Sequence, residues 1–132
     1  MNDRPDAQEL LGAVERFLRE DVVPALDGPR RLHARVAANV VAMVGREIAH
    51  GDADLRAEWC GLAELLERQG ESPPSDAAAL QRQVNEAGEE LVRRIRAGDA
   101  DAGPFRDAVL THLKRSVDAK LAVSLGPTKE KR

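Results

Sequence analysis

The chain has 132 residues, with 23 aspartates and glutamates against 20 lysines and arginines, and a formal net charge of −3 at pH 7. Aromatic residues make up only 2% of it. The chain therefore offers neither strong attraction to a phosphate backbone nor rings to stack on bases, which argues against nucleic-acid binding. The single cysteine excludes an internal disulfide and a thiolate zinc cage.

The first predicted helix covers about residues 7–23. Asp6 fits the N-cap position, and Glu9 follows three residues later, as in a capping box. Pro24 interrupts this helix, and Gly28-Pro29 predicts a turn. Its apolar stripe consists of Leu10, Leu11, Val14, Phe17 and Leu18.

Gly51 separates the next two predicted helices, which cover about residues 30–50 and 54–69. We expect Gly51 to be the left-handed C-cap of the earlier one. Residues 71–74 form a loop, because neither of its two prolines fits a helix interior. The apolar face of the helix after Gly51 consists of Leu55, Trp59, Leu62 and Leu66.

A fourth helix begins with Ser75 as its N-cap and ends before Gly98, and a fifth has Pro104 in its first turn. The apolar stripe of the fifth helix consists of Phe105, Val109, Leu113, Val117 and Leu121. Together these patterns predict an all-α fold, an up-and-down bundle of four to five helices with the second helix central. We expect residues 1–125 to form a single bundle domain and residues 126–132 to be a flexible tail.

No apolar run is long enough to span a bilayer, and the first ten residues lack a basic segment followed by an apolar one. We therefore expect a cytoplasmic protein without membrane contact.

The segment from Leu32 to Ile48 carries polar residues that do not fit a simple amphipathic helix. At about 100° per residue, Arg35, Asn39 and Arg46 share a narrow stripe at the edge of its apolar arc. Two interpretations of this stripe stay open. It is a solvated face, or it binds an anion or a partner, since guanidinium groups beside an amide suit carboxylates and phosphates.

Other polar residues fall inside apolar faces, and we expect them to be buried. Glu47 and Lys120 occupy such positions on the second and fifth helices, so they either pair across the core or extend to the bundle end. His33 is either a satisfied core histidine or a partner of Asp21. No nucleophile, phosphate-binding loop or metal-ligand spacing accompanies these residues. The sequence thus predicts no catalytic residue, no metal site and no cofactor.

Three segments carry a resemblance: RPDAQELLGAVERFLREDVVPALDG, HARVAANVVAMVGRE and AKLAVS. They resemble a bacterial family of small helical domains of unknown function. Its members occur alone or with aminoglycoside-phosphotransferase-like kinases, and often near acyl-CoA dehydrogenase genes. The resemblance implies a non-catalytic companion of such an enzyme system.

Two functions follow as hypotheses. The preferred one is an interaction or accessory module that docks on a protein partner or forms a homodimer. The alternative is a protein that binds an acyl compound or a phosphorylated acid, or an enzyme acting on one, with a polar pocket between the first, second and fifth helices.

Overall fold

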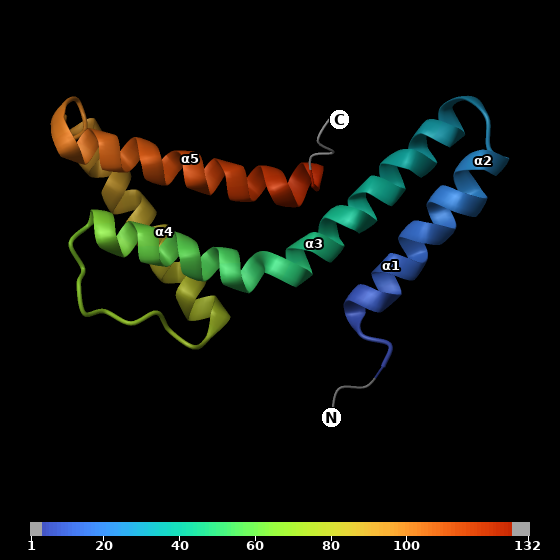
Figure 1. Ribbon diagram of the computed structural model, residues 1–132, viewed down its shortest axis with the longest axis horizontal. Coiled ribbons are helices and arrows are strands. Elements are labelled where there is room, and N and C mark those ends of the chain that lie inside the picture. Colours follow the sequence, from blue (N-terminus) through green and yellow to red (C-terminus); the bar gives the residue numbers. More distant parts are fainter. Residues whose placement is uncertain (1–3, 128–132) are drawn as a thin grey trace. The chain divides into compact units, whose positions relative to one another are not determined.

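Helices make up the regular structure of residues 4–127, the part of the chain that this computed structural model describes (Figure 1). They are α1 (Ala7–Phe17), the π-helical turn η1 (Leu18–Val22), α2 (Val23–Ala25), α3 (Gly28–Leu65), α4 (Ala77–Arg96) and α5 (Gly103–Leu125). No β-strand occurs between residues 4 and 127, and the all-α prediction is confirmed. Most of the tail predicted at 126–132 lies outside the described residues.

The start of α1 has the predicted capping box. The backbone N–H of Glu9 donates to Asp6 Oδ1 at 2.8 Å, and the N–H of Asp6 donates to Glu9 Oε2 at 2.9 Å. The predicted interruption at Pro24 is wrong, because α2 contains this proline. Proline lacks an amide hydrogen, and here it lies two residues after the end of the wider π-helical turn, in which the ordinary hydrogen-bond ladder is already shifted.

The predicted break at Gly51 is also wrong, since α3 runs without interruption from Gly28 to Leu65. A glycine inside a helix costs only about 1 kcal/mol relative to alanine, so it does not by itself end the helix. The helix is supported directly after this position by an ion pair between Arg56 Nε and Asp52 Oδ2 at 2.9 Å.

The remaining helix ends lie close to the predicted ones. The N-cap of α4 is Asp76 rather than Ser75, and its carboxylate accepts from the N–H of Ala79 at 2.8 Å. Gly98 follows α4 with a φ of +95°, a left-handed conformation that glycine adopts without the strain other residues would have there.

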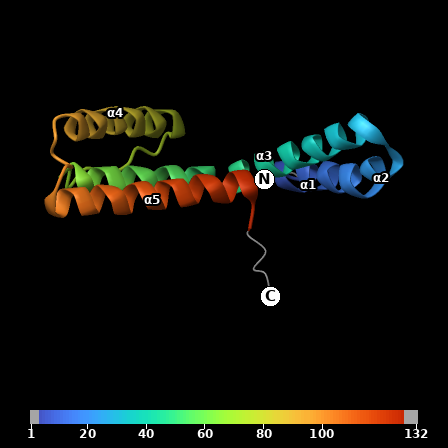
Figure 2. The ribbon, with the colours of Figure 1, turned by 90° about the horizontal axis from the view of Figure 1, so that it is seen from above.

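The chain divides into two compact units. The first comprises residues up to Gly51 together with residues from Ala122 on. In it, the segment formed by α1, η1 and α2 and the first part of α3, up to Gly51, run antiparallel, and we call these two segments with their connecting turn the hairpin (Figures 1 and 2). The hairpin has little core, because its buried apolar residues are only Val23, Ala34 and Ala38.

The second unit, Asp52–Leu121, has a core drawn from three helices. The end of α3, the middle of α4 and the first half of α5 contribute its buried cluster. The cluster consists of Leu62, Leu65, Leu66, Ala87, Leu91 and Val109. Trp59 is also buried, and its Nε1 donates to Gln83 Oε1 of α4 at 3.1 Å. The up-and-down topology, the central second helix and the single domain over residues 1–125 stay predictions.

Candidate functional site

The first part of α3 has two apolar faces, and only one of them is covered. The covered face consists of small residues, with Ala38 at 0% exposure and Ala34 buried beside it. Small side chains allow two helix backbones to approach closely. The opposite face has larger side chains, of which Val40 keeps 51% of its surface exposed. The hairpin therefore packs through its small residues and leaves its large apolar residues uncovered.

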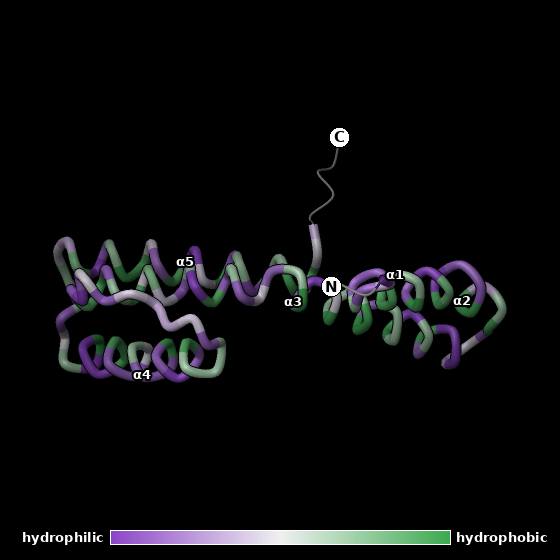
Figure 3. Tube along the Cα trace, turned by 90° about the horizontal axis from the view of Figure 1, so that it is seen from below, coloured by the Kyte–Doolittle hydropathy of each residue, from purple (hydrophilic) through white to green (hydrophobic). Residues whose placement is uncertain are grey.

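We call the uncovered large side chains of the hairpin the outer apolar surface. It consists of Leu10, Val14 and Phe17 on α1 and Leu32, Val36, Val40, Met43, Val44 and Ile48 on α3. Figure 3 shows hydrophobic positions along both helices. Complete burial of one such side chain is worth about 1.5–3 kcal/mol, so covering all of these half-exposed ones is worth on the order of 10 kcal/mol. That gain is comparable with the stability of a whole domain.

Two members of the predicted polar stripe have roles within the first unit. Asn39 Oδ1 accepts from Arg19 Nη2 at 3.0 Å, which connects α3 to η1. Arg46 Nε donates to the carbonyl of Val123 at 2.6 Å, and Arg46 Nη2 donates to that of Ser124 at 3.2 Å. Arg46 thereby satisfies carbonyls at the C-terminal end of α5, where a cation is also favoured by the helix dipole. Arg35 is exposed and has no hydrogen-bond partner among the described residues.

The polar residues expected to be buried are exposed in this structure. Asp21 and His33 both belong to the first unit, and among residues 4–127 no hydrogen bond or ion pair joins them. Glu47 and Lys120 belong to different units, so their pairing stays a prediction. Glu47 and His33 lie among the uncovered residues of α3, and their exposure follows from the exposure of that face.

The second unit buries a histidine that the sequence did not indicate. His112 on α5 is 6% exposed, and its Nε2 lies 3.3 Å from Glu58 Oε1 on α3. Gly61 makes room for the ring, because a Cβ at this position would lie only 2.5 Å from His112 Nδ1. Glycine is therefore required here for the close approach of α5 to α3.

The buried face of α5 explains why this histidine was missed. The stripe used for prediction, with its spacing of four, consists of large apolar residues, but Leu113, Val117 and Leu121 are exposed. The buried residues, Val109, His112 and Ser116, follow at intervals of three and four. A search for small or polar residues at this spacing, opposite a glycine on a neighbouring helix, could have found His112.

A surface cavity of about 580 Å³ lies in the second unit between α3 and α5. His112 forms part of its wall, and its charged lining consists of Glu64, Glu67, Asp107 and Arg115. With more carboxylates than guanidinium groups, this lining favours a cationic or neutral ligand over an anionic one. None of the polar residues predicted for a pocket lines this cavity.

Over residues 4–127, no group of three or more histidine, cysteine, aspartate or glutamate side chains is arranged to hold a metal ion. Across that same part of the chain, no helix combines the length and the apolar character needed to cross a membrane.

Residues 24–125 match the family described as a domain of unknown function (DUF6285), and since this match spans well over half of the sequence, the chain belongs to that family. Neither the curated proteins nor the solved structures contain a match to the chain.

Proposed function

We propose that this DUF6285 member is a non-catalytic interaction module that docks on another protein through the outer apolar surface of its hairpin. The observation that carries this proposal is the set of large apolar side chains left uncovered on α1 and α3, of which Phe17 is 57% exposed. Large uncovered apolar patches on a soluble domain mark sites of interaction with other molecules.

The partner class comes from the resemblance described above. It comprises aminoglycoside-phosphotransferase-like kinases and acyl-CoA dehydrogenases. An apolar helix surface of this kind fits a helical groove or a helix face on such an enzyme, since helix-in-groove docking uses anchors at intervals of three and four residues. Val36, Val40 and Met43 have this spacing.

The test is a binding titration of the immobilised chain with a purified kinase of this type and with a purified dehydrogenase. Replacing Val36 and Val40 by Asp puts two charges into the docking surface, so we expect binding to weaken more than about a hundredfold. The matched control is Val92→Asp, which changes a valine of the second unit that is 44% exposed, and it should bind like the unaltered chain. Equal weakening by the control, or no binding of either enzyme, contradicts the proposal.

The cavity beside His112 supports a second candidate function, the binding of a small molecule. Its lining favours an amine or a neutral compound, whereas an acyl-CoA or a phosphorylated acid would meet three carboxylates. Thermal-shift measurements separate these classes, because a ligand that binds only the folded chain raises the unfolding temperature. A shift with phosphorylated acids and none with amines contradicts this choice of ligand class.

A further inference from the structure

The two helices of the hairpin carry opposite charge. Residues 7–27 contain five acidic residues and two arginines, a formal charge of −3, whereas residues 28–50 contain four arginines and one glutamate, a formal charge of +3. The hairpin is therefore neutral as a whole and strongly polarised across its width. A surface of this kind is complementary to a second copy of itself in which the two helices exchange places.

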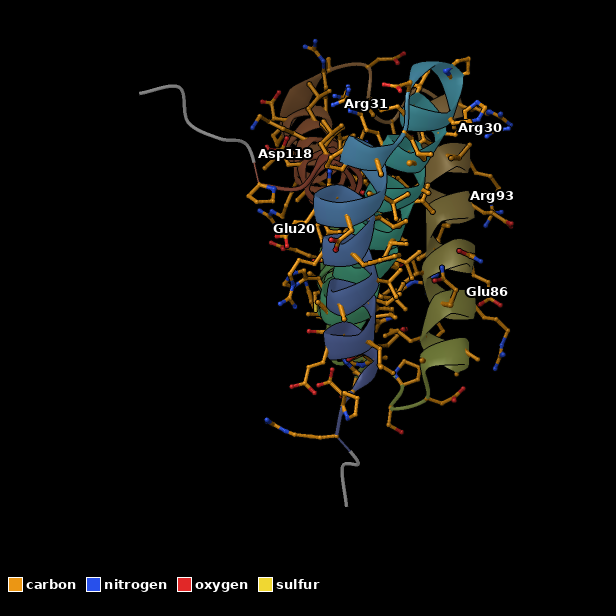
Figure 4. The ribbon with its side chains drawn as sticks, turned by 90° about the vertical axis from the view of Figure 1, so that its right-hand side faces the viewer. Glu20, Arg30, Arg31, Glu86, Arg93 and Asp118 are labelled. Atoms are coloured by element: carbon orange, nitrogen blue, oxygen red, sulfur yellow. The ribbon has the colours of Figure 1, made fainter. Side chains whose placement is uncertain are left out.

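The charges are concentrated near the turn that joins α2 to α3, which we call the closed end of the hairpin. Glu20, Asp21 and Asp27 lie before the turn, and Arg30 and Arg31 lie directly after it. Figure 4 shows Glu20 beside α1 and the two arginines near the turn. All five residues are exposed, and no ion pair is formed by any of them among the described residues. They are available to a molecule that covers the hairpin.

We propose that a second copy of this chain covers the outer apolar surface. In this dimer α1 of each copy lies against the first part of α3 of the other, with the two closed ends adjacent. The inference rests on the proposed function, because it names the occupant of the same docking surface. The four helices form an antiparallel bundle in which each α3 has an α1 on both sides, so both of its apolar faces are covered.

A second copy suits this surface better than a partner of uniform charge. A uniformly acidic partner complements α3 but repels α1, and a uniformly basic partner does the reverse. A neutral hairpin also meets another copy without net repulsion. In the dimer, the apolar stripe of α1 in each copy packs on that of α3 in the other. The two contacts are equivalent, as an isologous interface requires.

The experiment reverses the charges on one helix at a time and follows the dimer by sedimentation velocity at low salt. Glu20→Arg/Asp21→Arg in η1 makes residues 7–27 basic, and Arg30→Glu/Arg31→Glu makes the start of α3 acidic. Each variant alone places like charges across both contacts, so we expect its dimer dissociation constant to rise more than about tenfold. An equimolar mixture restores both contacts and should form a heterodimer about as stable as the unaltered dimer. High salt should reduce the difference between variants and mixture.

The matched control makes the same changes in net charge on α4 of the second unit. Glu86→Arg/Glu89→Arg and Arg93→Glu/Arg96→Glu alter exposed residues, of which Glu86 and Arg93 appear in Figure 4. These variants should dimerise like the unaltered chain, which separates a contact-specific effect from one of total charge. Far-ultraviolet circular dichroism verifies that each hairpin variant is folded, and recovery in the mixture verifies it independently.

The outcomes distinguish the dimer from the docking function. A monomeric unaltered chain, or a mixture that dimerises no better than its components, overturns the dimer. If that monomer still binds a kinase or dehydrogenase in a manner that Val36→Asp/Val40→Asp abolishes, docking stands and only its occupant changes. If the monomer binds neither enzyme, the proposed function fails as well. Dimerisation of the unaltered chain with rescue in the mixture supports the dimer, and the binding titration with the two enzymes then decides the docking function separately.

Discussion

The two units use similar amphipathic helices but bury them to different extents. In the second unit, α3, α4 and α5 enclose leucines such as Leu62 and Leu91. In the first, α3 lies beside the segment from α1 to α2 and meets the end of α5 at Arg46, and the buried apolar residues are a valine and two alanines. A pair of helices covers one face of each member only, so a helix that is apolar on two faces needs a further neighbour. The first unit therefore leaves one apolar face of α3 uncovered, whereas the second unit encloses its core.

The largest expected effect on stability is that of truncating a buried leucine of the second unit, compared with an exposed leucine of the first. Leu91→Ala removes a side chain that is 4% exposed and should lower the free energy of unfolding by about 2–5 kcal/mol through lost burial and a cavity. Leu32→Ala removes a leucine that is 59% exposed and should cost less than about 1 kcal/mol in the monomer. Urea unfolding at low protein concentration measures both.

The two leucine truncations should also differ in how their cost in stability depends on protein concentration. Where the dimer forms, Leu32 is covered and its truncation should cost more as concentration rises, because binding between folded copies adds to stability by mass action. The cost of Leu91→Ala should stay constant. A cost of Leu32→Ala that equals that of Leu91→Ala in the monomer contradicts the contrast between the units.

A second comparison concerns two glycines of the second unit. Gly61→Ala places a methyl group against the His112 ring, so α5 must shift from α3, and we expect a loss of about 1–3 kcal/mol. Gly88→Ala in α4 meets nothing within 4 Å and should stabilise the chain by up to about 1 kcal/mol through helix propensity. Thermal unfolding of both variants gives the sign. Stabilisation by Gly61→Ala would mean that His112 is not packed on α3.

Arg46 and Arg35 allow a similar test in the first unit. Arg46→Ala leaves the carbonyls of Val123 and Ser124 without their donor and should cost about 1–2 kcal/mol. Hydrogen exchange at the end of α5 should accelerate at the same time. Arg35→Ala removes an exposed side chain and should leave stability unchanged. Equal effects of the two changes indicate that Arg46 acts only as a surface charge.

The sequence predicted the fold class and some of the helix caps, because these depend on local patterns. The capping box at Asp6 is an example, since it requires only two residues three positions apart. Which face of a helix is buried depends on its neighbours, and here the pattern misled. Large apolar residues such as Val40 and Val117 were expected in the core, but the chain buries Ala38 and Ser116. Periodicity identifies an apolar face without identifying the molecule that covers it.

The candidate site was predictable only in part for the same reason. Asn39 and Arg46 were singled out from the helical pattern, but their hydrogen-bond partners, Arg19 and the end of α5, depend on tertiary packing. The pair of Glu58 and His112 joins residues far apart in the chain, and neither belongs to a recognisable motif.

Gly51 carries the smallest expected effect, but its sign decides between two conformations. As the left-handed cap predicted from the sequence, Gly51 would have a positive φ, and Gly51→Ala would be strained and destabilising. As an interior residue of α3, it should gain about 0.5–1 kcal/mol on replacement by alanine. The added Cβ fits, since its nearest neighbour is Glu47 Oε1 at 3.4 Å. Urea unfolding of the variant measures the difference, with Gly88→Ala as a reference for a glycine inside a helix. A loss of stability would indicate that a helix ends at Gly51, as the sequence predicted. A gain supports one continuous α3 through this position.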